Sequence, residues 1–155
     1  MPPTTAPRTP SLSADVAMWD RVQSLYARVE RELAHVMQRR HGIGLSEYLA
    51  LEKLYQAPDS ERRMQELADG IGLGQSSVTR LVGRLETAGF AYKDLCPDDR
   101  RGVYAVVTEA GRKRYEDARA TYAEALSAAL DSAAQDAAAQ DARPRGIVDA
   151  LRAAG

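Results

Sequence analysis

Apolar residues recur at intervals of three and four positions near the start of the chain, which is the spacing of one helix face. The stripe consists of Val16, Trp19, Val22, Tyr26, Val29, Leu33 and Val36. The pattern predicts a long amphipathic helix that begins at Ser11 or Ser13 and ends near Arg40. The segment His41–Gly44, which contains two glycines, breaks this helix.

A second, shorter helical pattern follows the break. Ser46 is its expected N-cap. Its apolar positions are Tyr48, Leu49, Leu51 and Leu54. The pattern stops before Pro58, because the residue that precedes a proline is disfavoured in a helix. The charged residues 58–63 are predicted to form a loop.

Residues 64–87 contain two helical patterns separated by a sharp turn. The first carries a small residue, Ala68, where a second helix would cross it. Gly72 follows four positions later, where the turn favours a positive φ, and Gly74 stands at the start of the second helix. The wedge between the helices is filled by Leu67, Ile71, Leu73, Val78, Leu81 and Leu85. This arrangement predicts a helix-turn-helix.

The second helix of this motif presents a small, polar and cationic face. Its apolar positions are Val78, Leu81, Val82 and Leu85. At about 100° per residue, the opposite face carries Ser76, Arg80, Gly83 and Thr87, flanked by Thr79 and Arg84. Such a face suits entry into a DNA major groove. The alternative is a plain helical hairpin whose arginines only contact solvent.

A β-hairpin pattern follows Gly89, which ends the second helix. Phe90, Tyr92 and Leu95 are predicted to alternate along the first strand, and Val103, Ala105 and Val107 along the second. Turn chemistry explains the proline, aspartates and glycine of the connecting loop.

Two arginines at the tip of this loop, Arg100 and Arg101, are not required by the turn. A guanidinium on a thin projecting loop suits a narrow minor groove, where the potential is most negative. Asp99 is placed to brace Arg101 by a charge-assisted hydrogen bond. The alternative is a self-neutralising cluster of exposed charges.

Together these motifs resemble the DNA-binding lobe of the MarR family of bacterial transcriptional regulators. The matching segments are ELADGIGLGQSSVTRLVGRLE, the wing Asp99–Gly102 and the exit Val107–Gly111. The resemblance extends over roughly residues 12–152, with specific motifs only in the middle third. Two positions depart from the family pattern, since Gly74 replaces a frequent serine cap and Gly83 a usually polar residue.

The resemblance implies an obligate homodimer. It also implies that the second helix of the motif reads the major groove, while Arg101 on the wing enters the minor groove. Control by a small molecule or by redox chemistry, acting at a cleft between the dimer frame and the winged helix, is common in the family.

The C-terminal third is again helical. Thr108 is expected to cap a helix that ends near residue 131, and a last helix is predicted over Ala133–Leu151, interrupted near Pro144 and Gly146. Twelve of the 25 residues from 118 to 142 are alanine, which favours a closely packed helix pair. We expect the first and last helices to bury their apolar stripes against a second copy of the chain.

The predicted fold is therefore mainly α with a small β-hairpin wing. A winged helix-turn-helix is flanked by N- and C-terminal dimerisation helices. The expected parts are a disordered arm (1–11), N-terminal helices for dimerisation with a candidate effector cleft (12–57), a DNA-binding lobe (58–108) and C-terminal dimerisation helices (109–155).

The net charge of −1 argues mildly against a nucleic-acid partner. The charge is uneven, however, because residues 80–114 hold eight Lys or Arg and five Asp or Glu, which is enough for phosphate contacts. No apolar run approaches the roughly 18 residues of a membrane span, and the N-terminus lacks the apolar segment of a signal peptide. The single cysteine fits a reducing compartment. We expect a cytoplasmic protein without membrane contact.

Three groups of side chains are candidate sites. The residues predicted to contact double-stranded DNA are Gln75, Ser76, Ser77, Thr79, Arg80, Arg84, Asp99, Arg100 and Arg101. Candidates for binding a small aromatic effector are Trp19, Tyr26, Tyr48 and Tyr55, although their spacing also fits a helix core. Cys96 is a candidate redox site because neighbouring arginines favour the thiolate, although it also fits a small apolar residue at a strand end.

Catalytic and metal-binding patterns are absent from the sequence. There is no G-x-S-x-G, no H-E-x-x-H and no cysteine pair, and His35 and His41 have poor spacing for a metal. We therefore expect neither enzymatic activity nor a cofactor.

These observations favour a sequence-specific repressor. We expect it to act as a homodimer on an inverted-repeat operator, with a small-molecule effector relieving repression. Two alternatives stay open. One is a thiol redox-sensing regulator that uses Cys96, and the other is a protein-interaction module that does not bind DNA.

Overall fold

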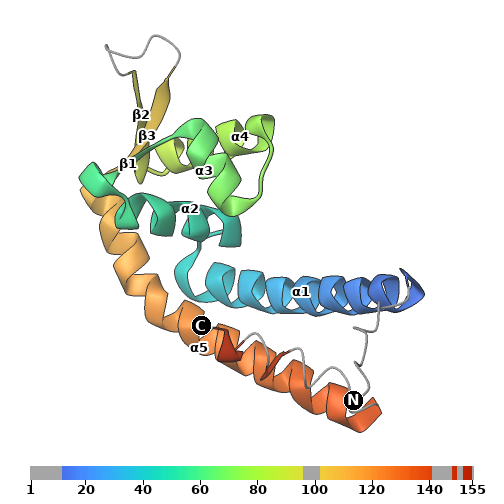
Figure 1. Cartoon of the computed structure of the whole chain (residues 1–155). Coiled ribbons are helices and arrows are strands. Elements are labelled where there is room, and N and C mark those ends of the chain that lie inside the picture. The colour runs from blue at the N-terminus through green and yellow to red at the C-terminus, as the bar shows by residue number, and fades with distance from the viewer. Residues whose placement is uncertain (1–11, 96–101, 141–147, 150–151, 155) are drawn as a thin grey trace, which may run out of the picture. The chain divides into compact units, whose positions relative to one another are not determined.

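The computed structural model describes residues 12–95, 102–140, 148–149 and 152–154. Helices and one small antiparallel sheet make up the described residues (Figure 1). In chain order the elements are α1 (Leu12–His41), α2 (Leu45–Gln56), the 3₁₀ turn η1 (Pro58–Ser60), β1 (Glu61–Arg63), α3 (Met64–Ile71), α4 (Gln75–Thr87), β2 (Ala91–Leu95), β3 (Val103–Val107) and α5 (Glu109–Gln140). The predicted fold class, mainly α with a small β wing, is confirmed.

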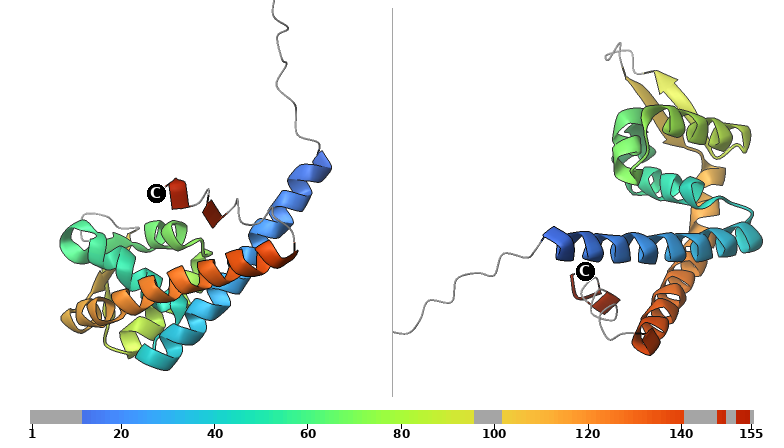
Figure 2. Two further views of the ribbon diagram at one scale, coloured as in Figure 1. Left: turned by 90° about the horizontal axis from the view of Figure 1, so that it is seen from below. Right: turned by 90° about the vertical axis from the view of Figure 1, so that its right-hand side faces the viewer.

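The chain divides into two compact units. One consists of residues 1–31 and 127–155, and the other of residues 32–126. The second unit contains the predicted helix-turn-helix and the sheet. Within it, the hairpin of β2 and β3 projects beyond α3 and α4, as both Figure 1 and Figure 2 show.

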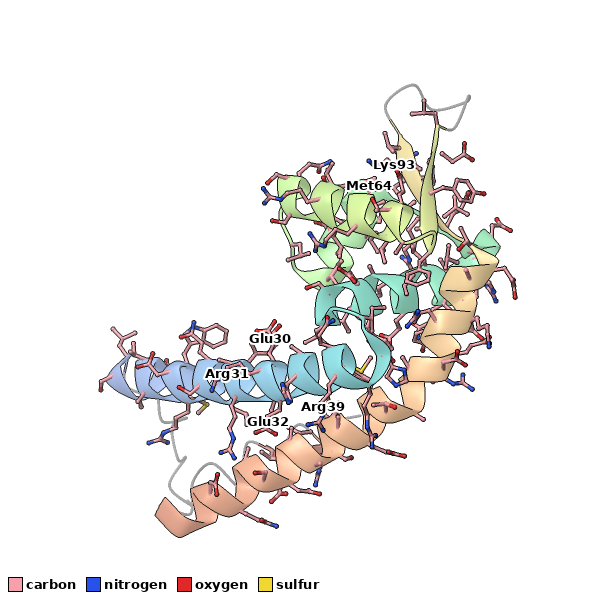
Figure 3. The ribbon with its side chains drawn as sticks, turned by 180° about the vertical axis from the view of Figure 1, so that it is seen from behind. Glu30, Arg31, Glu32, Arg39, Met64 and Lys93 are labelled. Carbon is pink, nitrogen blue, oxygen red and sulfur yellow. The ribbon has the colours of Figure 1, made fainter. Side chains whose placement is uncertain are left out.

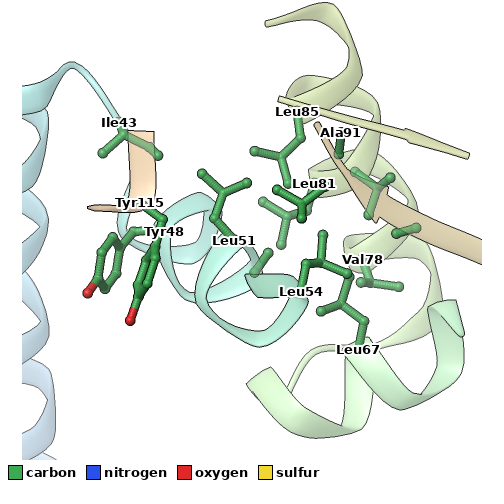
Figure 4. Packing of buried hydrophobic residues seen from close by; sticks show 14 of the residues in the cluster. Ile43, Tyr48, Leu51, Leu54, Leu67, Val78, Leu81, Leu85, Ala91 and Tyr115 are labelled. Atoms are coloured by element: carbon green, nitrogen blue, oxygen red, sulfur yellow. The ribbon is translucent and has the colours of Figure 1, made fainter. Parts of the chain in front are cut away.

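The core of the second unit joins α2 to the helix-turn-helix. Leu54 of α2, Leu67 of α3, and Leu81 and Leu85 of α4 have no exposed surface and belong to one apolar cluster (Figure 4). Burial of each such leucine stabilises the fold by about 1.5–3 kcal/mol. The residues predicted to fill the wedge lie in or against this cluster, so the predicted crossing of α3 and α4 is confirmed.

Two glycines allow the turns that flank α4. Gly72 follows α3 with φ 71° and ψ 32°, and its N–H bonds back to the carbonyl of Asp69. Gly89 follows α4 with φ 78°. Both angles lie in the left-handed region that favours glycine, as the sequence predicted.

The start of α2 differs from the prediction. Gly44, in an extended conformation, is the N-cap, and Ser46 lies within the first turn. The N–H of Gly44 donates to Glu47 Oε2 over 3.3 Å. The prediction that Ser46 caps this helix is wrong, because the glutamate in the first turn satisfies the cap from inside the helix.

The sheet has three strands in the order β1–β3–β2, all antiparallel. Residues 58–63, predicted as a loop, instead form η1 and the short edge strand β1, in which Arg62 pairs with Ala105. This strand was missed because three polar residues carry no alternating apolar signal.

The register of the hairpin corrects the predicted faces of its first strand. Leu95 pairs with Val103, whereas Tyr92 pairs with Val106. Tyr92 and Leu95 therefore lie on opposite faces, since side chains alternate along a strand. The predicted inward face of the second strand is confirmed for Ala105, which is fully buried.

The junction between the hairpin and α5 depends on Thr108 and Gly111. The hydroxyl of Thr108 accepts the N–H of Gly111 over 3.1 Å and donates to the carbonyl of Gly89 over 2.7 Å. A Cβ atom at Gly111 would collide with the carbonyl oxygen of Phe90. The predicted threonine cap is confirmed, and the glycine permits the first turn of α5 to pack against the chain that follows α4.

α5 is longer than predicted. It continues without a break from Glu109 to Gln140, so the predicted end near residue 131 is wrong. The helix continues because this stretch is rich in alanine, the residue with the highest helix propensity. Pro144 and Gly146, where a further interruption was predicted, lie outside the described residues.

In the unit formed by residues 1–31 and 127–155, α1 and α5 are bridged by polar contacts. Arg28 donates to Ser132 Oγ over 2.9 Å and pairs with Asp136 at 2.6 Å. Ala129 and Ala133 of α5 are buried. Within this unit, small side chains on α5 therefore lie in the packed interior.

Each helix in the described part of the chain is too short or too polar to span a membrane.

Candidate nucleic-acid interface

α4 divides into a buried and an exposed face. Val78, Leu81, Val82 and Leu85 have no exposed surface. The exposed residues opposite them are Gln75, Ser76, Thr79, Arg80, Arg84 and Thr87, and Ser77 and Gly83 are half-buried. The structure therefore brings six predicted DNA contacts onto one helix, Gln75, Ser76, Ser77, Thr79, Arg80 and Arg84.

The polar side chains of this face have different local partners. Thr79 donates its hydroxyl to the carbonyl of Gln75 over 2.9 Å, and Thr87 does the same to Gly83 over 3.0 Å. Arg80 is exposed and makes no hydrogen bond or ion pair within the described residues. Its guanidinium therefore has its five N–H donors available for an external anion or base.

Arg84 is held by a neighbouring helix. Its Nε lies 3.1 Å from Oε1 of Glu47 on α2. The Arg84 side chain is 57% exposed and that of Glu47 is 25% exposed. This ion pair directs the Arg84 side chain toward the start of α2. Arg84 is therefore restrained by a partner, whereas Arg80 is not restrained by any described residue.

A shallow hollow lies on the exposed face of α4. It has a volume of about 520 Å³ and is lined by Arg80, Gly83, Arg84, Thr87 and Ala88. Gly83 lies at its centre along the helix, so the absence of a side chain at this position opens the hollow.

A second pocket, of about 340 Å³, lies at the base of the wing. It is lined by Arg63, Met64, Gln65, Gln75, Thr79, Lys93, Gly102 and Val103. Met64 and Lys93 lie close together where the hairpin meets the helices (Figure 3). The pocket thus connects the first turn of α4 to the hairpin, and its lining is polar and cationic on one side.

Two cations of this pocket were not predicted as contacts. Lys93 on β2 is 37% exposed and lies 3.9 Å from Glu86 Oε1. Arg63 at the end of β1 donates from Nε to the hydroxyl of Tyr104 over 3.0 Å and stacks on its ring. The sequence could have indicated Lys93 as a DNA contact, since it is the single cation in a predicted strand that follows a helix-turn-helix. Nothing in the sequence indicated Arg63 as a contact, because strand β1 itself was not predicted.

The comparisons with known proteins find similar transcriptional regulators. A sequence model of the MarR family matches residues 41–102. The HTH-type transcriptional regulator YkoM of Bacillus subtilis is 26% identical over 116 residues, which cover 71% of this chain and 74% of that protein. The crystal structure of Sco3205, a MarR family transcriptional regulator from Streptomyces coelicolor in complex with DNA, has a TM-score of 0.70 and 26% identity, covering 83% of this chain and 80% of that chain.

Over residues 41–102 this chain is similar to the MarR family, and its fold is similar to that of solved MarR family regulators. A further MarR family transcriptional regulator from Streptomyces coelicolor, AbsC, shares the fold with a TM-score of 0.69 and 22% identity. That likeness covers 94% of this chain and 99% of AbsC.

Four of the predicted site residues lie outside the described residues. They are Cys96, the redox candidate, and Asp99, Arg100 and Arg101, the candidate wing contacts. The described strands on either side, β2 and β3, are paired from Ala91 with Val107 to Leu95 with Val103. The two strands are thus paired along their full described length, up to both sides of residues 96–101.

The aromatic residues predicted to bind an effector fall into both units. Trp19 and Tyr26, which are 60% and 65% exposed, lie in the unit that contains the start of α1. Tyr48 and Tyr55 lie in the other unit. The effector candidates are therefore divided equally between the two units.

Tyr48 is buried in a stack of tyrosines. Its ring centroid lies 4.6 Å from that of Tyr122 and 5.5 Å from that of Tyr115, both on α5. The ring of Tyr115 also contacts that of Tyr55 in a tilted arrangement, with the centroids 4.7 Å apart. Burial, helped by neighbouring tyrosines and by Glu52, raises the pKa of Tyr48 well above its ordinary value. Tyr115 and Tyr122 were missed because a stack between distant helices leaves no periodic signal in either.

Proposed function

We propose that this protein is a sequence-specific regulator of transcription that binds double-stranded DNA through α4 and the wing. The observation that carries the proposal is the exposed face of α4, where Arg80 has no partner among the described residues. Gln75 and Thr79 of the same helix line a pocket together with Arg63 and Lys93. Arg80 would donate hydrogen bonds to the edge of a base. The cations of the pocket would bind backbone phosphates. The similar protein Sco3205 was solved in complex with DNA.

The proposed contacts on α4 are Gln75, Ser76, Ser77, Thr79, Arg80 and Arg84. Those on the wing are Asp99, Arg100 and Arg101. Insertion of Arg101 into the minor groove would place the wing beside the major groove that α4 occupies.

We further propose that the regulator is a homodimer. Support comes from apolar side chains that α1 leaves in solvent, namely Leu12 at 84%, Val16 at 62%, Met18 at 56% and Trp19 at 60% exposure. An apolar patch of four large residues at one end of a helix is unusual on a solvent-exposed surface. The same helix of a second copy would bury this patch in a symmetric interface. Two copies of α4 about 34–36 Å apart would then face an inverted repeat.

The sign of regulation and its control are part of the same proposal. We propose repression by occupation of an operator, relieved by a small aromatic effector. Trp19, Tyr26, Tyr48 and Tyr55 are the effector candidates. Within this group the half-buried Tyr55 donates its hydroxyl to Glu116 over 2.8 Å, and Arg112 stacks on its ring at 4.6 Å.

A salt titration tests the central proposal. Binding of the full chain is measured against the DNA upstream of its own gene and against a scrambled duplex of equal length. Selective binding with a steep negative salt slope supports a regulator that reads DNA. Failure to bind either duplex at low salt would reject the proposal. Sedimentation of the free protein tests the dimer, and a monomer at micromolar concentration would reject that part.

A further inference from the structure

Gly83 is an unfavourable residue for its place in the fold. It lies in the interior of α4, between Gln75 and Thr87, where the backbone is helical. In a helix interior glycine is less favourable than every residue except proline, because it loses the most backbone freedom on folding. α4 also lacks a side-chain hydrogen bond at its N-cap, Gly74. A weak helix start makes a further helix-weakening residue harder to tolerate.

The packing of the protein does not require this glycine. A Cβ atom at Gly83 would meet no other atom within 4 Å. Its φ lies outside the positive range that excludes other residues, unlike that of Gly72 or Gly89. Gly111 is the contrast, since a Cβ there would collide with the backbone of Phe90. Neither conformation nor internal packing explains why position 83 is glycine.

The surroundings of Gly83 indicate what approaches it. The hollow above it is lined by Arg80 one turn before and by Thr87 one turn after, with Arg84 adjacent. The hollow therefore has no side chain at Gly83, and its lining includes Arg80, which makes no ion pair within the described residues, and Arg84, which pairs with Glu47. An arginine without an internal partner suits a polyanion. An α-helix with its side chains is about 10–12 Å across. A DNA major groove is about 12 Å wide, so one absent side chain changes how deeply a helix sits.

We propose that the hollow at Gly83 receives the edge of a base pair, and that Gly83 is a specificity-determining residue because it lets α4 sit deep in the major groove. This inference rests on the proposed function, since it requires that α4 enters DNA. The edge of the base pair contacts the backbone of α4 at Gly83, while Arg80 reaches a neighbouring base. Any side chain at this position holds the helix away from the groove floor.

Opposite effects on stability and binding follow from this geometry. Gly83→Ala adds a methyl group to open space and favours the helix, so we expect the melting temperature to rise by about 2–4 °C. The same methyl group occupies the hollow, so we expect affinity for the preferred duplex to fall by at least about fivefold. Gly83→Gln fills the hollow further and should weaken binding more, although glutamine offers new hydrogen bonds to DNA.

The experiment uses the full chain and a library of random duplexes, from which the parent protein enriches its preferred site. Melting temperature, affinity and base preference at each position are then measured for the parent, G83A and G83Q. Gly70→Ala is the matched control, because it adds a Cβ to another helical glycine whose nearest neighbour is the flexible side chain of Lys53. G70A should keep the affinity and base preference of the parent.

Each result has one meaning. A stabilised G83A with weaker binding, and with altered preference confined to one or two base pairs in each half-site, supports the inference. Unchanged affinity and preference in G83A and G83Q would overturn it and leave the proposed function intact. Tighter binding by G83Q, or loss of stability in G83A, would also overturn it. If the parent enriches no site, sequence-specific binding itself is rejected, and the inference falls with it.

Discussion

The guanidinium of Arg84 on α4 donates to the carboxylate of Glu47 on α2, with Nε and Oε1 3.1 Å apart. The other oxygen of the same carboxylate accepts the N–H of Gly44, the N-cap of α2, over 3.3 Å. One acidic side chain therefore caps α2 and restrains a cation on the helix proposed to enter DNA. Both side chains retain solvent contact, so the pair contributes about 0–1 kcal/mol to folding.

Glu47→Gln keeps an acceptor for the N–H of Gly44 and removes the charge that holds Arg84. We expect E47Q to bind every duplex more tightly, by up to about tenfold, because the released guanidinium gains a phosphate contact. The slope of log affinity against log salt should become steeper by about one. Salt titrations with specific and scrambled DNA measure both effects.

The control for this prediction is the same substitution in an Arg84→Ala background. A double-mutant cycle isolates the coupling between the two side chains. If E47Q tightens binding equally when Arg84 is absent, the carboxylate acts by its own repulsion of DNA, and the restraint on Arg84 has no part in recognition.

Arg80→Ala tests base reading by α4. Arg80 makes no ion pair or hydrogen bond in the described structure, and its neighbours on the helix do not restrain it as Glu47 restrains Arg84. We expect discrimination between the preferred and a scrambled duplex to shrink by about 1–3 kcal/mol, the range of one bidentate base contact. Competition binding measures the ratio. An equal loss on both duplexes would assign Arg80 to phosphate.

Lys93→Ala tests the pocket at the base of the wing. Lys93 lies on β2 in the lining of this pocket, and its ammonium is 3.9 Å from Glu86 Oε1. We expect affinity to fall by the same factor on specific and scrambled DNA, with the salt slope shallower by about one. Lys113→Ala is the control, since Lys113 is exposed on α5 and pairs there with Asp117. A selective loss on the preferred site alone would contradict phosphate binding at Lys93.

Arg101→Ala tests the wing. We expect it to weaken binding to the preferred site at least about tenfold, because a guanidinium in a narrow minor groove is lost. The melting temperature and the sedimentation of the free protein should not change, because the tip of a turn contributes little to a core. Affinity equal to that of the parent would remove the wing from the proposed mechanism.

Local regularities made most of the fold predictable. The three- and four-residue spacing of apolar side chains indicated α1 and α2, and Ala68, Gly72 and Gly89 indicated the turns of the helix-turn-helix. Thr108 indicated the start of α5. These signals are readable because a helix or a turn depends on residues only a few positions apart.

Contacts between distant segments were not predictable in the same way. Arg84 and Glu47 are 37 positions apart, and either could equally have faced solvent. Strand β1 exists because β3 offers it a partner, not because Glu61–Arg63 favours a strand. Lys93 becomes part of a pocket with Arg63 only through the register of the sheet.

The candidate interface shows the same division. The sequence by itself determined that one face of α4 is apolar and the other polar, because helical periodicity follows from the chain alone. Only the tertiary structure decided that Arg80 has no partner in the described residues while Arg84 is restrained, and that Gly83 opens a hollow instead of packing against a neighbour. The physical reason is that a partner or an open space at a side chain depends on which distant elements pack beside it, and packing is a property of the folded chain.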